Sequence, residues 1–275
     1  MEKLTIFNDD ETRFINSRIV SLANNELAGE IFVEPINNEN IIDIKLKNPK
    51  AKQLISLVLS DEIIDFFEKR LMYKIINKSC GAFTNIERMS IYNIANEMVQ
   101  KDSASKRMMR RDIINKSLAE FLNTSNRLIL KGFVKFRLKR YITELEVMVE
   151  KAVRQFMVER EHKEFISLLK YFIDIQEPKV KCVHVVVDAP LQYRFFDGKH
   201  RDITDDCFKD FLMNAYEVNI NYDDLLVSTL ITLAPKELYF HHFDRISNKE
   251  LATTIKQVFE KRIKICDGCK FCKKN

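Results

Sequence analysis

The stretch from Val134 to Phe156, which reads VKFRLKRYITELEVMVEKAVRQF, decides the fold of this chain. Apolar side chains recur in it every three or four residues, an interval close to one helical turn. They are Val134, Leu138, Tyr141, Leu145, Met148, Ala152 and Phe156. On a helix these residues form one stripe, so the stretch predicts a long amphipathic helix over residues 132–158 with its apolar face in a core.

The same helical period extends in both directions from this stretch. It begins at Asn48-Pro49, where a capping residue precedes a proline suited to the first helical position. It ends before Pro178. The other helices predicted in this region span about 49–59, 61–78, 86–101, 104–123 and 160–175. Residues 48–177 are therefore predicted to form a helical body.

Strand-like sequence lies at both ends of the helical body. Residues 1–47 contain the apolar run Leu4–Phe7, but this segment is too small to fold alone. After Pro178 the apolar period shortens to two, as in CVHVVV from Cys182 to Val187. We expect the N-terminal strands to join those of residues 178–275 in one mixed sheet. The predicted fold class is α+β, predominantly α-helical, with this smaller mixed sheet beside the helical body.

The composition fits a cytoplasmic protein. The chain has 275 residues, 46% of them hydrophobic, and its net charge of +5 demands no acidic partner. The best candidate for a membrane span, Leu225–Ala234, has about half the required length, so no membrane insertion is expected. The opening MEKLTIFNDD lacks the pattern of a secretory signal. The six cysteines are therefore expected to be reduced thiols or metal ligands.

The strongest chemical pattern is CDGCKFC, from Cys266 to Cys272. Thiols at intervals of three are a metal-ligand pattern, and Asp-Gly between the first two allows the tight turn that such loops need. The predicted ligands are Cys266, Cys269 and Cys272, with a fourth from Cys207, His241 or His242. The cofactor would be zinc or an iron–sulfur cluster. A thiol-rich tail without function and a redox pair are alternative interpretations of the same residues.

A basic stretch in the helical body predicts a second kind of site. No acidic residue interrupts the sequence between Arg127 and Arg140. Three lysines four residues apart would share one helix face. On that face they could contact successive phosphates of a nucleic acid. A solvated or internally paired face gives the same pattern and is the commoner explanation. The candidate nucleic-acid-binding residues are Arg110, Arg111, Lys131, Lys135 and Lys139.

No combination of residues in the sequence predicts a catalytic site. The acid pairs Asp205-Asp206 and Asp223-Asp224 stand at predicted helix starts, where carboxylates cap free amide groups. The histidines lack a partner in any motif for nucleophilic catalysis, and there is no Gly-rich phosphate loop and no HExxH. His241 and His242 are adjacent in a predicted strand, so at most one can join a given site. We therefore expect a protein that is not an enzyme.

The order of several segments resembles that of a known family. FRLKRYITELEVMVEKAVRQFMVEREHKEFISLLKYFIDIQ (136–176) is followed by CVHVVV (182–187), NYDDLLVSTLITLAP (221–235) and ICDGCKFC (265–272). In these segments the chain resembles the YtxC-like sporulation proteins of endospore-forming bacteria. The resemblance implies a cytoplasmic protein of the sporulation programme without an established activity, and it carries over no catalytic residue. The leading expectation is a non-enzymatic interaction protein with an unknown protein partner. The alternatives are a metal or iron–sulfur protein and a nucleic-acid-associated factor.

Overall fold

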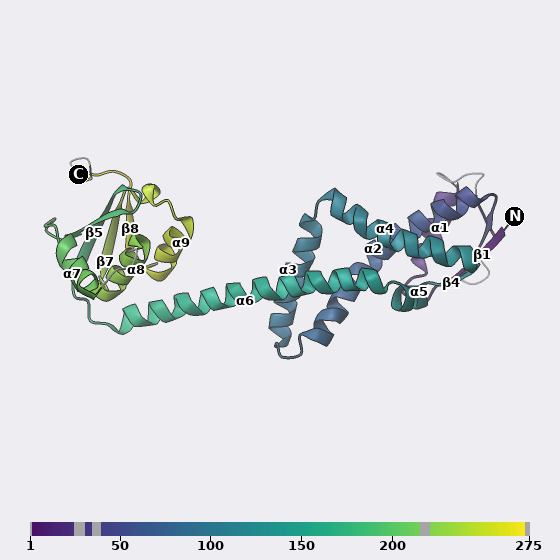
Figure 1. Ribbon diagram of the computed structural model, residues 1–275, viewed down its shortest axis with the longest axis horizontal. Coiled ribbons are helices and arrows are strands. Elements are labelled where there is room, and N and C mark those ends of the chain that lie inside the picture. Colours follow the sequence, from purple (N-terminus) through teal and green to yellow (C-terminus); the bar gives the residue numbers. More distant parts are fainter. Residues whose placement is uncertain (1, 25–30, 35–39, 215–220, 273–275) are drawn as a thin grey trace. The chain divides into compact units, whose positions relative to one another are not determined.

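The computed structural model describes residues 2–24, 31–34, 40–214 and 221–272. The chain divides into two compact units, Met1–Val158 and Glu159–Asn275, and the division falls inside the long helix α6 (Lys139–Ile175). Each unit has its own sheet and its own helices (Figure 1). Among the described residues, no helix is both long enough and apolar enough to cross a membrane.

The sheet of the first unit has the strand order β2-β3-β1-β4. The elements that form or connect it are β1 (Glu2–Phe7), α1 (Phe14–Asn24), β2 (Ile31–Val33), β3 (Ile41–Leu46) and β4 (Arg127–Ile129). Strand β1 pairs antiparallel with β3 and parallel with β4. Alternate residues of β1 and β3, such as Leu4, Ile6 and Ile44, are completely buried. One face of this sheet therefore covers the core of the unit.

Helices build the rest of the first unit. They are α2 (Pro49–Ser79), α3 (Asn85–Lys101), α4 (Ala104–Thr124), α5 (Leu130–Arg137) and the first half of α6. At the start of α2, the side chain of Asn48 accepts a hydrogen bond from the backbone N–H of Ala51. At the start of α3, Thr84 and Glu87 form a capping box. These caps satisfy amide groups that have no partner within the helix, so both helices begin where the sequence provides a cap.

The predicted apolar stripe is buried in this unit. Leu138, Tyr141, Leu145 and Ala152 are at most 1% exposed, so the predicted core face is confirmed. The predicted boundaries of the helix were inaccurate. A break at Leu138 separates α5 from α6. Helix α6 then runs without interruption through the position near residue 160 where a new helix was expected.

The sheet of the second unit has the strand order β6-β5-β7-β8. Its strands are β5 (Cys182–Ala189), β6 (Gln192–Asp197), β7 (Glu237–His241) and β8 (Ile263–Cys266). Strands β5, β7 and β8 are parallel, and β6 pairs antiparallel with β5. The connecting helices are α7 (Thr204–Asn214), α8 (Tyr222–Leu233), the short 3-10 helix η1 (Phe243–Arg245) and α9 (Lys249–Val258). Because α9 joins the parallel strands β7 and β8, both strands end at the same edge of the sheet.

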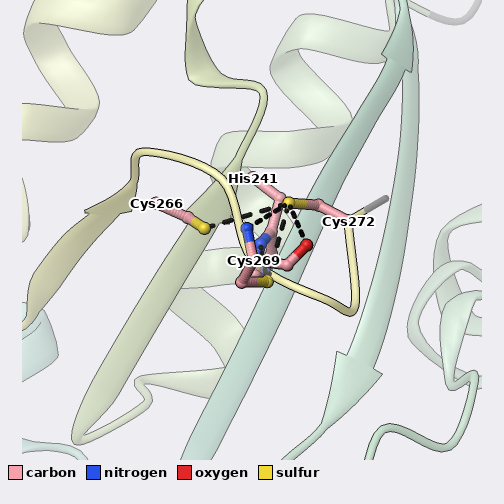
Figure 2. A group of neighbouring side chains, drawn as sticks. All are labelled: His241, Cys266, Cys269 and Cys272. Atoms are coloured by element: carbon pink, nitrogen blue, oxygen red, sulfur yellow. Dashed lines mark hydrogen bonds between the residues drawn. The ribbon is translucent and has the colours of Figure 1, made fainter. Parts of the chain in front are cut away.

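The two faces of the second sheet carry different side chains. Val185 and Phe240 are completely buried and belong to the same core as Leu230 of α8. The alternate residues His184 and His241 on the same strands project from the opposite face. That opposite face is where the segment after β8 lies (Figure 2).

The α+β, predominantly helical fold class is confirmed, but the expected single mixed sheet is wrong. Leu4–Phe7 pairs within the first unit, and the described strands after residue 180 form a separate sheet. The physical reason is β4, a strand of three residues that lies between two of the predicted helices. It pairs with β1 and completes the N-terminal sheet locally.

Candidate metal centre

Two potential metal ligands stand at the ends of neighbouring strands. His241 is the last residue of β7, Cys266 is the last residue of β8, and the two residues are partners in the parallel pairing. Adjacent strands lie about 4.8 Å apart, so partners on the same face are close neighbours. The sheet itself therefore brings this imidazole and this thiol together.

The segment after β8 turns back toward the same point (Figure 2). Gly268 has a φ of +123°, a conformation that residues with a side chain rarely adopt. Its N–H donates to Sγ of Cys266 at 3.4 Å, and the N–H of Cys269 donates to Sγ of Cys272 at 3.0 Å. These two hydrogen bonds hold the backbone of the turn against the two sulfurs. The turn therefore returns two further thiols to the strand ends.

The four side chains converge, as Figure 2 shows. Sγ of Cys272 lies 3.9 Å from Sγ of Cys266 and 3.5 Å from Sγ of Cys269. Nδ1 of His241 lies 3.7 Å from Sγ of Cys269, and all four ligand atoms lie within 4.8 Å of one another. A tetrahedral zinc ion with zinc–sulfur bonds of about 2.3 Å requires sulfurs about 3.8 Å apart. The spacing therefore fits four ligands around one ion.

The donor set favours a single ion over a cubane iron–sulfur cluster. Each thiolate of a cubane binds a different iron, so its sulfurs must be farther apart than sulfurs that share one ion. Three sulfurs and one imidazole nitrogen are a frequent ligand set of structural zinc, whereas magnesium and calcium prefer oxygen. The site residues include no carboxylate.

The environment of the site keeps its donors suitable for a metal. Burial and the neighbouring His242 and His200 lower the pKa of His241, so its imidazole is neutral near neutral pH. The backbone N–H of Cys272 lowers the pKa of the Cys269 thiol. Burial raises the pKa of the Cys266 thiol, and a bound cation would favour its thiolate form.

Two residues that the sequence offered as fourth ligands lie apart from the other donors. His242 has a φ of +56°, and its Nε2 lies 3.2 Å from the backbone oxygen of Cys272, so it contacts the backbone of the tail. The group of convergent donors among the described residues does not include it. Cys207 lies on α7 and packs against the core of the unit, where burial raises its thiol pKa to about 11. The structure instead places His241 beside the three tail cysteines.

No sequence pattern identifies the residues that surround the site. Nδ1 of His184 on β5 lies 3.1 Å from Nε2 of His241. Phe271 in the tail has its ring 5.3 Å from that of His241 and 4.3 Å from that of His200. These contacts depend on strand pairing and on the path of the tail, which no local pattern reveals.

The candidate nucleic-acid residues lie in the first unit, and several are already paired. Arg110 is buried between Glu68 and Asp102. Arg111 forms an ion pair with Asp61, and Lys131 with Asp9. The amine of Lys135 lies 5.0 Å from the centre of the Phe136 ring. Within the described residues Lys135 and Lys139 form no ion pair. They lie on either side of the break at Leu138, so they do not continue one helix face.

Comparison with known proteins gives one family and one curated relative. The YtxC-like family matches residues 53–264. The relative is "Uncharacterized protein YtxC" of Bacillus subtilis (strain 168), which is 23% identical over 236 residues, covering 82% of this chain and 81% of the relative. No solved structure matches the chain. The family match includes His241 but ends before Cys266, so the case for the metal centre rests on the geometry.

Proposed function

The chain belongs to the YtxC-like family, and we propose that it is a zinc protein whose ion is held by His241, Cys266, Cys269 and Cys272. One observation carries the proposal: four donors of the types that zinc prefers have their ligand atoms within 4.8 Å of one another. Chance clusters of exposed acidic groups are common, but this cluster has no acidic member, and both His241 and Cys272 are buried.

The proposed role of the ion is structural. Four protein ligands fill a tetrahedral coordination sphere, so no position remains for the water or substrate that a catalytic zinc ion must bind. The ion would connect the tail to the ends of β7 and β8, and its binding free energy would stabilise that arrangement.

Elemental analysis of the full chain after anaerobic purification tests this proposal. We expect about one zinc per chain in the wild type, and a large loss in Cys269→Ser. Cys207→Ser is the matched control. It also removes one half-buried thiol, but Cys207 lies outside the cluster. A visible absorption spectrum separates zinc, which is colourless, from iron bound by thiolates. Substoichiometric metal in the wild type, unchanged by Cys269→Ser, would contradict the proposal.

We also propose a broader role as a cytoplasmic interaction protein of the sporulation programme. One observation favours the interaction: Phe165, Leu168, Phe172 and Ile175 follow one another at helical spacing on α6, and each is 48–59% exposed. Aromatic and aliphatic side chains grouped on a surface are typical of protein interfaces. In an endospore-forming host, Leu168→Asp should lower spore yield without lowering the amount of folded protein. An unchanged yield would count against this role.

A further inference from the structure

We propose that His184 is a positioning residue of the metal centre. It accepts a hydrogen bond from His241 and thereby determines which ring nitrogen of His241 binds the ion. This inference rests on the zinc site proposed above. It concerns a residue that lies outside the ligand set, on strand β5.

The argument begins with the two nitrogens of His241. Its Nδ1 faces the sulfurs, at 3.7 Å from Sγ of Cys269, so the lone pair that binds a metal must be on Nδ1. A neutral imidazole then carries its proton on Nε2. That nitrogen lies 3.1 Å from Nδ1 of His184, a normal hydrogen-bond distance. His241 therefore donates, and His184 accepts.

The same reasoning assigns the proton of His184. Because its Nδ1 accepts from His241, a neutral His184 carries its proton on Nε2. This nitrogen lies 3.6 Å from Sγ of Cys182, within the range for a weak hydrogen bond to sulfur. The result is a chain in which each group donates to the next, from His241 to His184 to Cys182.

Using an imidazole as the acceptor has an electrostatic consequence. A centre that consists of a doubly charged cation and three thiolates has a net charge of minus one. The acceptor behind a metal-bound histidine is commonly a carboxylate, which would add a second negative charge close to the first. A neutral imidazole orients His241 without this repulsion. The arrangement therefore suits a thiolate-rich site.

The ring of His184 is held by its neighbours. It is stacked on Tyr239, its register partner on β7, with ring centres 4.9 Å apart and planes at 19°. The ring of His200 lies 4.7 Å away, and Phe271 of the tail contacts the His184 ring edge-on at 5.9 Å. These contacts restrict rotation of His184, so the acceptor nitrogen keeps its direction toward His241.

Zinc affinity, measured by chelator competition on the metal-free full chain, tests the inference. His184→Leu removes the acceptor, and we expect about 10- to 100-fold weaker zinc binding. His184→Asn places an amide oxygen near the position of Nδ1 and should recover much of that loss. His162→Leu makes the same change at an exposed position on α6, so it is the matched control and should bind zinc like the wild type.

A second readout requires no variant. In the zinc-loaded wild type, ¹⁵N NMR of the histidine side chains should show a protonated Nε2 and a metal-bound Nδ1 on His241. Metal on Nε2, or His184→Leu binding zinc as tightly as the wild type, would overturn the inference while leaving the zinc site intact. A wild type that binds no zinc would overturn the proposed function and this inference together. If His184→Leu does not fold, the NMR assignment decides.

Discussion

His241 and Cys266 are register partners at the ends of two parallel strands, so their relative position is fixed by the hydrogen bonds of the sheet. Cys269 and Cys272 have no such support, because they belong to the segment that follows the last strand. The proposed ion would therefore bind two donors that the sheet positions and two that belong to the tail.

Removal of the metal should loosen the tail more than the sheet. We expect a chelator to increase hydrogen exchange in residues 267–272, while β5 and β7 stay protected by a core that includes Val185 and Phe240. Exchange measured by mass spectrometry with and without chelator checks this. Equal loss of protection across the whole second unit would show that the ion supports the core as well. No change in the tail would argue against an ion at this point.

Gly268→Ala should weaken metal binding through backbone strain alone. A Cβ at this position would meet nothing within 4 Å, but the φ of +123° is unfavourable for alanine. We expect a cost of roughly 1–3 kcal/mol to the metal-bound turn, measured as a weaker zinc affinity. Gly81→Ala is the control, because its Cβ would also meet nothing while its φ is not positive. Equal affinities for the two variants would show that the turn tolerates the strain.

The sequence predicted the features that depend on local spacing. The stripe that includes Tyr141 and Leu145 follows from the helical period, and the convergence of the tail thiols was expected from their intervals of three. The choice among Cys207, His241 and His242 could not be made, because it depends on the register of β7 against β8. That register is set by hydrogen bonds between strands separated by a helix.

Two features of the structure could not be predicted from any local pattern in the sequence. Strand β4 has three residues, too few for a period of two to be recognised, and missing it led to the expectation of one sheet in place of two. His184 touches His241 across a separation of 57 residues. A pairing of this kind becomes visible only once the strands are placed side by side.

Arg110 and Arg111 should differ greatly in their contribution to stability. The side chain of Arg110 is 7% exposed and pairs with Glu68 and Asp102. Arg110→Met would therefore leave the buried carboxylate of Glu68 without its cation and leave Asp102 with Lys106 alone. We expect a loss of about 3–5 kcal/mol in the free energy of unfolding of the first unit. Arg111→Met removes a partly exposed pair with Asp61 and should cost at most about 1 kcal/mol. Hydrogen exchange of α4 measures the loss of stability in each variant. Similar losses in the two variants would contradict the prediction.

The same buried ion pair should make the first unit sensitive to acid. Burial alone would raise the pKa of Asp102, but hydrogen bonds from Arg110 and Lys106 outweigh it and hold the pKa below its ordinary value. A carboxyl group whose pKa is lowered by folding stabilises the protein above its unfolded pKa of about 3.9, and that contribution is lost as the pH falls through the folded value. Stability should therefore decline below about pH 4.

Asp102→Asn isolates this contribution. At pH 7 the variant should be less stable than the wild type by about 1.5–3 kcal/mol, because it loses hydrogen bonds to charged partners. The difference should shrink as the pH falls below 4, because protonated Asp102 is also uncharged. Asp65→Asn is the control, since the Asp65 pair with Arg107 is exposed and should contribute little at any pH. Hydrogen exchange of α3 and α4 at pH 7 and near pH 3 gives both differences. A gap between wild type and Asp102→Asn that stays constant with pH would mean that Asp102 does not titrate in this range.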